Sequence, residues 1–158
     1  MTKHLSLSLP EKTGFGTIVN EAVNLLFGPL TGRGVTVEIA PDLPDVYVDP
    51  ARIREVMVNL IENAIKFIGN RPDPVIRIDV DDYGETPVFF MQDNGIGIDP
   101  RYLEQIFNLF EGLDVSTHGS GIGLPIVRRI IELYGGKIWA ESEGLGKGTT
   151  FRFMLQFA

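Results

Sequence analysis

A stripe of polar residues at helical spacing marks the first place in this sequence where chemistry could be carried out. The segment DPARIREVMVNLIENAIKF, residues 49–67, carries at steps of three and four Arg52, Glu55, Asn59, Asn63 and Lys66. Such steps place side chains along one face of a helix. Asparagine is a poor helix former, so helix propensity does not explain Asn59 and Asn63. An amide oxygen is a suitable Mg²⁺ ligand and a lysine could meet a phosphate, although a solvated helix face would show the same pattern.

A second candidate is the segment QDNGIGIDP, residues 92–100. Gly95 and Gly97 permit a tight turn in which the side chain of Asp93 points inward. A carboxylate in that place can accept a hydrogen bond from an exocyclic amine, and the glycines would let a base such as adenine approach closely. Turns favour aspartate and glycine in any case, so the motif by itself is weak.

The third candidate is the glycine-rich segment HGSGIGLP, residues 118–125, which precedes an apolar run with helical spacing. The free N–H groups and the dipole of such a helix would face an anion. The spacing G-x-G-x-G, without a preceding strand, excludes the dinucleotide-binding fingerprint. Lys147 in GLGKGTT is followed by glycine rather than serine or threonine, which excludes a Walker A loop. The sequence contains no HRD motif, which argues against a protein-kinase glycine loop.

These candidates must be held by the elements that the hydrophobic pattern predicts. We expect helices over 13–30 (stopped by Gly28 and Pro29), 49–67 (with Asp49 as N-cap), 99–107 and 125–136 (closed by Gly135), and strands over 34–41, 46–48, 74–82, 86–93, 137–142 and 149–157, with a further short strand ending at Pro10. Within 49–67 the apolar stripe comprises Ile53, Val56, Met57, Leu60, Ile61, Ala64 and Ile65. Strands in pairs, rather than in alternation with helices, favour a layered α+β fold.

The bulk composition narrows the function classes. A chain of 158 residues with 44% hydrophobic residues can bury one core and is expected to form a single domain. No apolar run approaches the length of a membrane span, and zero cysteines leave no disulfide or thiolate metal site, which fits a cytoplasmic location. The net charge of −7 argues against nucleic acid as a partner.

In chain order, N-x-x-x-N-A-x-K, D-x-G-x-G-I, a phenylalanine pair, G-x-G-x-G-L and G-T form a specific series. The series resembles the ATP-binding catalytic domain of two-component sensor histidine kinases, in the superfamily of heat-shock chaperones, type II topoisomerases and mismatch-repair ATPases (GHKL, Bergerat fold). NLIENAIKF looks like the N box, DNGIGI and GSGIGL the first two glycine boxes, IFNLF the F box and GKGTTF the third glycine box. We expect this domain to span residues 14–158, after an N-terminal segment of residues 1–13.

The resemblance implies a two-layer sandwich in which a mixed, mostly antiparallel sheet of about five strands packs on three helices, with a short ATP lid. It implies that Asn63 coordinates Mg²⁺ beside Asn59, that Lys66 approaches the phosphates and that Phe67 packs on the adenine. Asp93 would bond the adenine amine within the turn formed by Gly95, Gly97 and Ile98, and Thr149 would reach the base through water. The remaining ATP contacts would come from backbone N–H groups of Gly119, Ser120, Gly121, Ile122, Gly123 and Leu124.

The lid would run from Glu111 to His118, with Phe107 and Phe110 as hinge packing or as ordinary core residues. An arginine that often follows the F box is replaced here by Gly112, and Arg101 is a weak substitute for it. The position four residues before Asn63 separates the subclasses. Water-activating members of the superfamily carry a glutamate there as general base, whereas this chain carries Asn59, which cannot take up a proton. The kinase branch has asparagine there, so we expect phosphoryl transfer, with Glu55 as a helper group.

The phosphoacceptor is missing from these 158 residues, since nothing resembles the S-H-E-L-R-T-P-like box of the family. His4 lies in a strand-like segment and His118 at the edge of the lid, and neither is expected to act as acceptor. We therefore expect an excised, monomeric domain that does not phosphorylate itself, without direct membrane contact. Its partners would be a separate histidine-bearing dimerisation domain and, indirectly, a response regulator. A stand-alone serine kinase of the anti-sigma-factor type and a degenerate nucleotide-binding module remain alternatives.

Overall fold

The chain folds around one mixed five-stranded sheet, and the computed structural model describes residues 9–83, 86–108 and 123–155. The strands are β2 (Thr36–Ile39), β4 (Val75–Tyr83), β5 (Thr86–Asp93), β6 (Lys137–Glu141) and β7 (Thr149–Met154). Their spatial order is β2-β4-β5-β7-β6. Only β2 and β4 run parallel, and the other neighbours in this sheet are antiparallel. The predicted mixed, mostly antiparallel sheet is confirmed.

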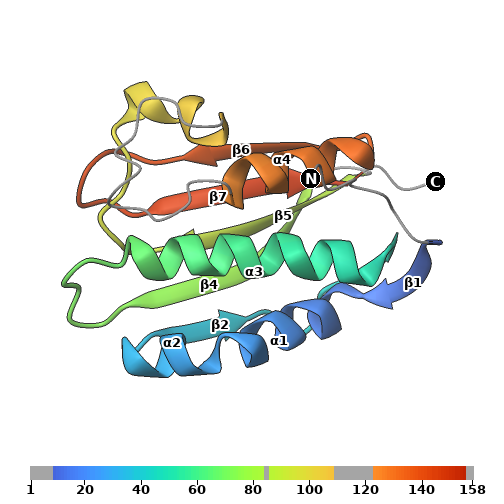
Figure 1. Ribbon diagram of the computed structural model, residues 1–158, viewed down its shortest axis with the longest axis horizontal. Helices are drawn as coiled ribbons and strands as arrows, with labels where there is room; N and C mark the ends of the chain where they lie inside the picture. Colours follow the sequence, from blue (N-terminus) through green and yellow to red (C-terminus); the bar gives the residue numbers. More distant parts are fainter. Residues whose placement is uncertain (1–8, 84–85, 109–122, 156–158) are drawn as a thin grey trace, which may run out of the picture.

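Three helices cover one face of this sheet (Figure 1). They are α1 (Phe15–Leu25), α3 (Pro50–Lys66) and α4 (Gly123–Leu133), and α3 packs between the other two. A separate two-stranded antiparallel sheet joins β1 (Glu11–Gly14) to β3 (Asp45–Val48). This pairing fastens the start of α1 to the start of α3, because each helix directly follows one of the two strands. The predicted two-layer α+β sandwich is therefore confirmed.

The core lies between the sheet and the helices and is rich in aromatic rings. Phe15 of α1 packs against Phe89 of β5 with ring centroids 4.2 Å apart, and Phe153 of β7 completes the cluster. All three side chains are at most 1% exposed. Phe89 and Met91 of β5, and Phe151 and Phe153 of β7, face this layer as alternate residues of their strands.

Helix α3 matches its sequence-based prediction closely. The Asp49 carboxylate accepts a hydrogen bond from the Ala51 N–H at 3.0 Å, and Pro50 occupies the first helical position. The whole predicted apolar stripe is buried: Ile53, Val56, Met57, Leu60, Ile61, Ala64 and Ile65. The polar stripe consequently lies along the edge of the helix that is partly exposed to solvent.

Helix α1 differs from its prediction at its C-terminal end. The chain leaves the helix at Leu26, and Gly28 and Pro29 do not stop it but lie within a second short helix, α2 (Phe27–Gly32). A proline is tolerated at the third position of a helix because the N–H that it lacks has no intrahelical acceptor there. Gly28 and Pro29, predicted to end the helix, therefore lie in the first turn of the next one.

Two other predicted helices also differ from the structure. Residues 99–107 form two 3₁₀ turns, Pro100–Tyr102 and Gln105–Phe107, rather than an α-helix. The segment is short, and its capping residue Asp99 bonds the Arg101 N–H within a single turn. The described part of helix α4 begins at Gly123, two residues before the predicted start, while Gly135 ends it with φ 72° as predicted.

The predicted strand ending at Pro10 falls mainly on residues 1–8, which lie outside the described residues, and Leu9 and Pro10 are not in a strand. The sequence-based prediction did not include β1, which pairs with β3 and spans the predicted domain boundary between residues 13 and 14. A four-residue strand of mixed polarity carries too little periodicity to be recognised.

We predict that the aromatic cluster determines the stability of the domain. Replacing Phe89 by alanine removes a fully buried ring and should lower the free energy of unfolding by about 3–5 kcal/mol, measured by urea denaturation. Phe27→Ala is the matched control, because that ring is 67% exposed, and it should change the free energy of unfolding by less than about 0.5 kcal/mol. Equal effects of the two substitutions would contradict this account of the core.

Candidate nucleotide-binding site

The candidate site is built around a buried carboxylate, Asp93, at the C-terminal end of β5. Its side chain is 5% exposed and accepts a hydrogen bond from the Gly95 N–H at 2.8 Å. The backbone N–H of Thr149, at the start of β7, donates to it as well. Burial raises the pKa of Asp93 to about 6, and these two hydrogen bonds act in the opposite direction. The carboxylate thus has part of its hydrogen-bonding capacity filled, and it is held at the C-terminal end of a central strand.

The turn after Asp93 requires glycine at two positions. A Cβ atom at Gly95 would collide with the carbonyl oxygen of Phe67, the C-cap residue of α3. Gly97 has φ 77°, a left-handed conformation, and a Cβ atom there would collide with the Gly144 carbonyl oxygen. The two glycines therefore let the turn approach both α3 and the β6–β7 loop, and they leave the space beside Asp93 without side chains.

The polar edge of α3 meets the first turn of α4. The Asn59 side-chain N–H donates to the Glu55 carbonyl oxygen at 3.0 Å, which fixes the orientation of the amide. A Cβ atom at Gly123 would lie 3.1 Å from the Asn59 Oδ1 atom, so this oxygen faces the start of α4. The Glu55 carboxylate is itself paired with Arg52 at 2.9 Å. An amide oxygen and the first N–H groups of a helix thus lie at one place, which suits an anion and its counter-ion.

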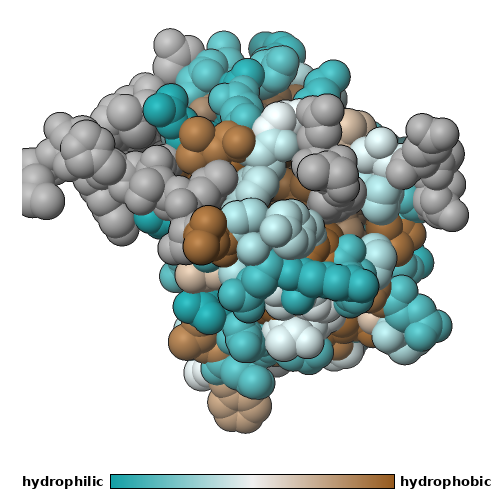
Figure 2. Space-filling view, turned by 90° about the vertical axis from the view of Figure 1, so that its right-hand side faces the viewer, coloured by the Kyte–Doolittle hydropathy of each residue, from teal (hydrophilic) through white to brown (hydrophobic). Residues whose placement is uncertain are grey.

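The other predicted residues of α3 and the adjacent turn lie close to this arrangement. Asn63 is partly exposed one turn after Asn59, and Lys66 is the exposed last residue of α3. Phe67 is half-buried, and its carbonyl oxygen accepts from the Ile96 N–H at 2.8 Å. The C-terminal end of α3, the end of β5 and the β6–β7 loop all lie at the left of Figure 1. The opposite end carries hydrophilic residues interspersed with hydrophobic ones (Figure 2).

The remaining predicted site residues divide into two groups. Ile98, Leu124 and Thr149 are buried or half-buried at the turn, in α4 and in β7. Gly119, Ser120, Gly121 and Ile122, with the predicted lid of residues 111–118 and Phe110, lie outside the described residues. The structure therefore brings the base end of the predicted site together and leaves these phosphate-binding predictions as predictions.

Two lid-related predictions can be assessed. Phe107 is 4% exposed, packs edge-on against Phe151 and has the Arg128 guanidinium 6.0 Å above its ring, which fits the core interpretation. Arg101 is paired with Asp99 at 2.8 Å, so its guanidinium is already engaged by a neighbouring carboxylate. Burial of Phe107 is compatible with hinge packing, whereas the pairing of Arg101 weakens its candidacy as a phosphate-binding cation.

The donor set fits a magnesium ion that arrives with a phosphate ligand. Within residues 9–83, 86–108 and 123–155 there is no group of three histidine, cysteine or carboxylate side chains that could hold a metal ion. Asn59 and Asn63 offer amide oxygens, and Mg²⁺ usually retains waters and phosphate oxygens around one or two protein ligands.

Sequence reasoning missed two polar residues at the base end of the site, Arg71 and Ser142. Arg71 donates to the carbonyl oxygens of Gly95 and Gly146, and Ser142 is bonded to Ile98 and Gly148. Arg71 lies in a loop and Ser142 at a strand end, where no periodicity distinguishes them. Their contacts depend on the tertiary structure alone.

Comparison with known proteins places this geometry in a family. The model of the histidine kinase-, DNA gyrase B- and HSP90-like ATPases (HATPase_c) matches residues 48–158. The chain belongs to this family of ATPases. The match includes α3, the turn after β5, and β7, the elements that meet around Asp93.

The relatives of the chain include a histidine kinase and a phytochrome. It is 49% identical over 146 residues to the methanogenesis regulatory histidine kinase FilI of Methanothrix harundinacea, covering 92% of this chain and 16% of that protein. It is 39% identical over 150 residues to cyanobacterial phytochrome B of Nostoc sp., covering 92% of this chain and 20% of that protein. The chain thus spans a fifth or less of the length of these relatives.

Solved structures of other proteins superpose well on this chain. The catalytic domain of histidine kinase ThkA superposes with a TM-score of 0.79 at 28% identity, covering 94% of this chain and 95% of that domain. Full-length ShkA in complex with AMPPNP superposes with a TM-score of 0.81 at 27% identity, covering 99% of this chain and 33% of ShkA. In the described part of the chain, no helix is both long and apolar enough to cross a membrane.

The raised pKa of Asp93 predicts a specific pH dependence of stability. Between the ordinary value of 3.8 and about 6 the folded state holds a proton that the unfolded chain has lost, so the contribution of Asp93 to the free energy of unfolding falls as pH rises. It is constant above about pH 6, and the total change corresponds to about 3 kcal/mol. Urea denaturation of the wild type and Asp93→Asn between about pH 4 and pH 7 measures this contribution. The free energy of unfolding of the wild type minus that of Asp93→Asn should fall as the pH rises to about 6 and then stay constant.

Asp73→Asn is the matched control, because it makes the same chemical change at an exposed position. The carboxylates with lowered pKa values, Asp99 and Glu141, are common to all three proteins and cancel in the difference. A difference between the wild type and Asp93→Asn that stays constant over this pH range would contradict the burial penalty.

Proposed function

We propose that this chain binds Mg-ATP and transfers the γ-phosphoryl group to a histidine on a separate phosphoacceptor domain, as the catalytic domain of a two-component histidine kinase. The proposal is carried by two contacts of α3: its C-cap residue Phe67 touches the glycine turn that follows the buried carboxylate Asp93, and its Asn59 amide oxygen faces Gly123 of α4. Membership of the ATPase family and the histidine kinases among its relatives support the same activity.

The base end of the site is suited to adenine. Two backbone N–H groups already bond the Asp93 carboxylate, and an ionised carboxylate has further lone pairs for an exocyclic amine. The side-chain-free turn at Gly95 and Gly97 lets a flat ring approach. Guanine carries a carbonyl oxygen at the corresponding ring position and would face the carboxylate with like partial charge. Asp93 therefore selects adenine over guanine.

The phosphate end is proposed from the edge of α3 and the start of α4. Asn63 supplies an amide oxygen for Mg²⁺, Asn59 orients groups beside it, and Lys66 at the end of α3 contributes positive charge. Backbone N–H groups from Gly119 to Leu124 hold the phosphates. Bound Mg²⁺ supplies charge neutralisation on the phosphate oxygens.

The residue types favour transfer to a protein over hydrolysis. Asn59 cannot act as a general base, and Glu55 is occupied by its ion pair with Arg52. A water molecule would therefore lack an activating group at this position. A neutral imidazole nitrogen is already nucleophilic, so an acceptor histidine needs positioning rather than proton removal. The role left to the chain is to align the γ-phosphoryl group for in-line attack.

The partners follow from that reaction. The acceptor histidine is proposed to lie on a helical dimerisation domain, from which a response regulator then receives the phosphoryl group. Among the structural neighbours, ThkA is known in complex with the response regulator protein TrrA, which supports this order of partners. We further propose that the domain by itself is monomeric and works in the cytoplasm, where ATP is available.

Binding of Mg-ATP tests the site directly. In a calorimetric titration, Asp93→Ala should lower the affinity for ATP about tenfold or more, because a charge-assisted hydrogen bond to the base is lost. Asn63→Ala should weaken Mg-ATP by a similar factor but leave ATP in excess EDTA nearly unchanged. Asp73→Ala and Asn70→Ala, both at exposed positions, are the controls. Wild-type affinity in both site variants would refute the assignment.

The acceptor is tested by transfer from radiolabelled ATP to a separately produced histidine-bearing domain of a relative such as FilI. The expected product is stable in alkali and labile in acid, as phosphohistidine is. A product stable in acid and labile in alkali would indicate a serine kinase instead. ATP binding without any transfer, for the chain joined to that domain as well as for the separate parts, would indicate a nucleotide-binding module.

A further inference from the structure

The two loops that flank Asp93 are joined by a small set of side-chain hydrogen bonds. One loop is the turn of residues 94–98 after β5, and the other is the β6–β7 loop of residues 142–148. A direct backbone bond links them, from the Gly146 N–H to the Ile96 carbonyl oxygen at 2.6 Å. Loops of this kind, rich in glycine, lose much conformational freedom when they are ordered, so one bond is a weak restraint.

Ser142 uses its full hydrogen-bonding capacity on these loops. Its hydroxyl donates to the Gly148 carbonyl oxygen at 2.7 Å. The same oxygen atom accepts from the Ile98 N–H at 3.1 Å and from the Gly144 N–H at 3.2 Å. A hydroxyl has one donor and two acceptor sites, so all three are occupied. Ser142 thereby connects the residue that follows Gly97 to the residue that precedes Thr149.

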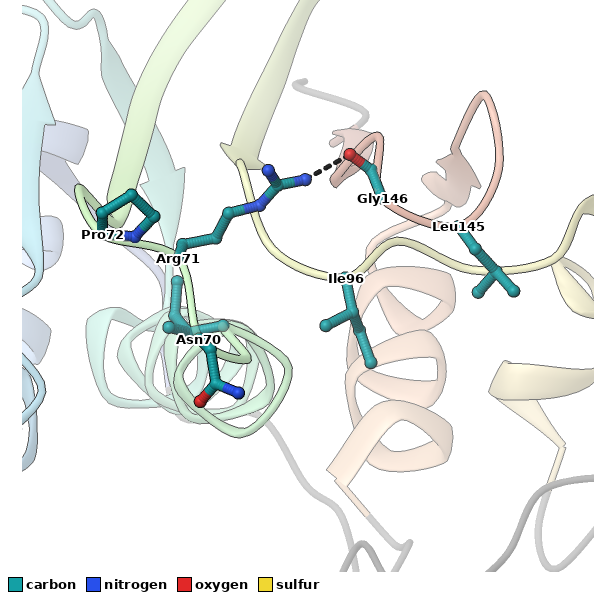
Figure 3. Close-up of a pocket in the computed structure, with 7 residues that line it drawn as sticks. Asn70, Arg71, Pro72, Ile96, Leu145 and Gly146 are labelled. Carbon is teal, nitrogen blue, oxygen red and sulfur yellow. Dashed lines mark hydrogen bonds between the residues drawn. The ribbon is translucent and has the colours of Figure 1, made fainter.

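Arg71 performs a similar role from a third segment, the loop between α3 and β4. Its guanidinium donates to the Gly146 carbonyl oxygen and, at 3.5 Å, to the Gly95 carbonyl oxygen. Figure 3 shows this side chain extending from its loop to the β6–β7 loop beside Ile96. It crosses an open pocket of about 450 Å³ whose apolar lining includes Ile68, Pro72 and Leu145. Asp93 does not line this pocket, so Arg71 acts from outside the nucleotide site.

Both loops are in direct contact with the proposed base-binding residue. A Cβ atom at Gly148 would collide with the Asp93 carbonyl oxygen, and one at Gly97 would collide with the Gly144 carbonyl oxygen. The Gly95 N–H of the first loop donates to the Asp93 carboxylate, and so does the N–H of Thr149, which directly follows Gly148 of the second loop. A displacement of either loop would therefore change the surroundings of the Asp93 carboxylate, so the residues that fix the loops also fix those surroundings.

We propose that Ser142 and Arg71 are positioning residues for the adenine end of the site, holding the two glycine loops at the separation that admits the base. The inference rests on the proposed function, because it assumes that Asp93 binds adenine. Neither residue touches the nucleotide. Their effect is on the base end, so adenosine and ATP are affected by the same factor.

The test uses Ser142→Ala, Arg71→Ala and, as conservative variants, Ser142→Thr and Arg71→Lys. Each alanine variant should weaken adenosine and ATP equally, by about five- to twentyfold, the effect of one or two hydrogen bonds. Ser142→Thr keeps the hydroxyl and should restore most of the affinity, and Arg71→Lys keeps one donor to Gly146 and should restore part of it. Glu143→Ala, an exposed position in the same loop, is the control and should bind as the wild type does.

A second measurement needs no ligand. Amide hydrogen exchange by NMR should show faster exchange of the Ile98 and Gly144 N–H groups in Ser142→Ala, by about tenfold, with amides of α3 unchanged. If Ser142→Ala does not fold, Arg71→Ala carries both tests, because its side chain lies at an exposed position and its loss should accelerate exchange of the Gly146 N–H.

The outcomes separate this inference from the proposed function. Wild-type binding of ATP together with unchanged affinity in both alanine variants would overturn the positioning role alone. A loss confined to ATP, with adenosine unaffected, would also overturn it, since the defect would then lie at the phosphates. A wild-type chain that binds neither ligand would overturn the proposed function, while the exchange measurement would still decide whether Ser142 holds the two loops.

Discussion

The structure depends on keeping a carboxylate, Asp93, almost completely out of water at the end of a central strand. Burial of this group is unfavourable for its charged form and raises its pKa to about 6. Backbone N–H groups of Gly95 and Thr149 compensate in part, and they can do so only because two glycine turns approach the carboxylate closely. Burying the carboxylate costs solvation free energy, and ordering the glycine turns around it costs conformational free energy. Binding of a ligand to the carboxylate is a reason for the fold to retain both costs.

The fold supplies the rigid surroundings that such a group needs. The strand that ends at Asp93 lies between β4 and β7. Phe89, four residues before Asp93 and on the same face of this strand, packs in the aromatic cluster with Phe15 and Phe153. Helix α3 is fixed by the burial of its entire apolar stripe, and its C-cap residue Phe67 is bonded to the turn after β5 through the Ile96 N–H. Tyr134 at the end of α4 accepts a hydrogen bond from the Asp49 N–H at 2.7 Å, which ties α4 to the start of α3. The proposed base site at the sheet and the proposed phosphate site at the helices thereby belong to one framework.

Much of this arrangement could be predicted from the sequence. The long strands and α3 have strong periodicity, and the capping of α3 by Asp49 and the end of α4 at Gly135 follow from local chemistry. Local signals failed where segments are short: β1 is four residues long, α2 places Pro29 in a first turn, and residues 99–107 form 3₁₀ turns. Arg71 and Ser142 could not be predicted, because their partners are backbone atoms brought near by the tertiary structure.

The central claim is that Asp93 is a buried carboxylate whose ionised form binds the amine of adenine. The most direct measurement is an NMR titration of the Asp93 side-chain carboxyl carbon in the free chain and in the chain saturated with adenosine. The account predicts a pKa of about 6 in the free chain and a clearly lower pKa with adenosine bound, since the ligand stabilises the charged form. A free pKa near the ordinary value of 3.8, or a pKa that adenosine leaves unchanged or raises, would contradict it.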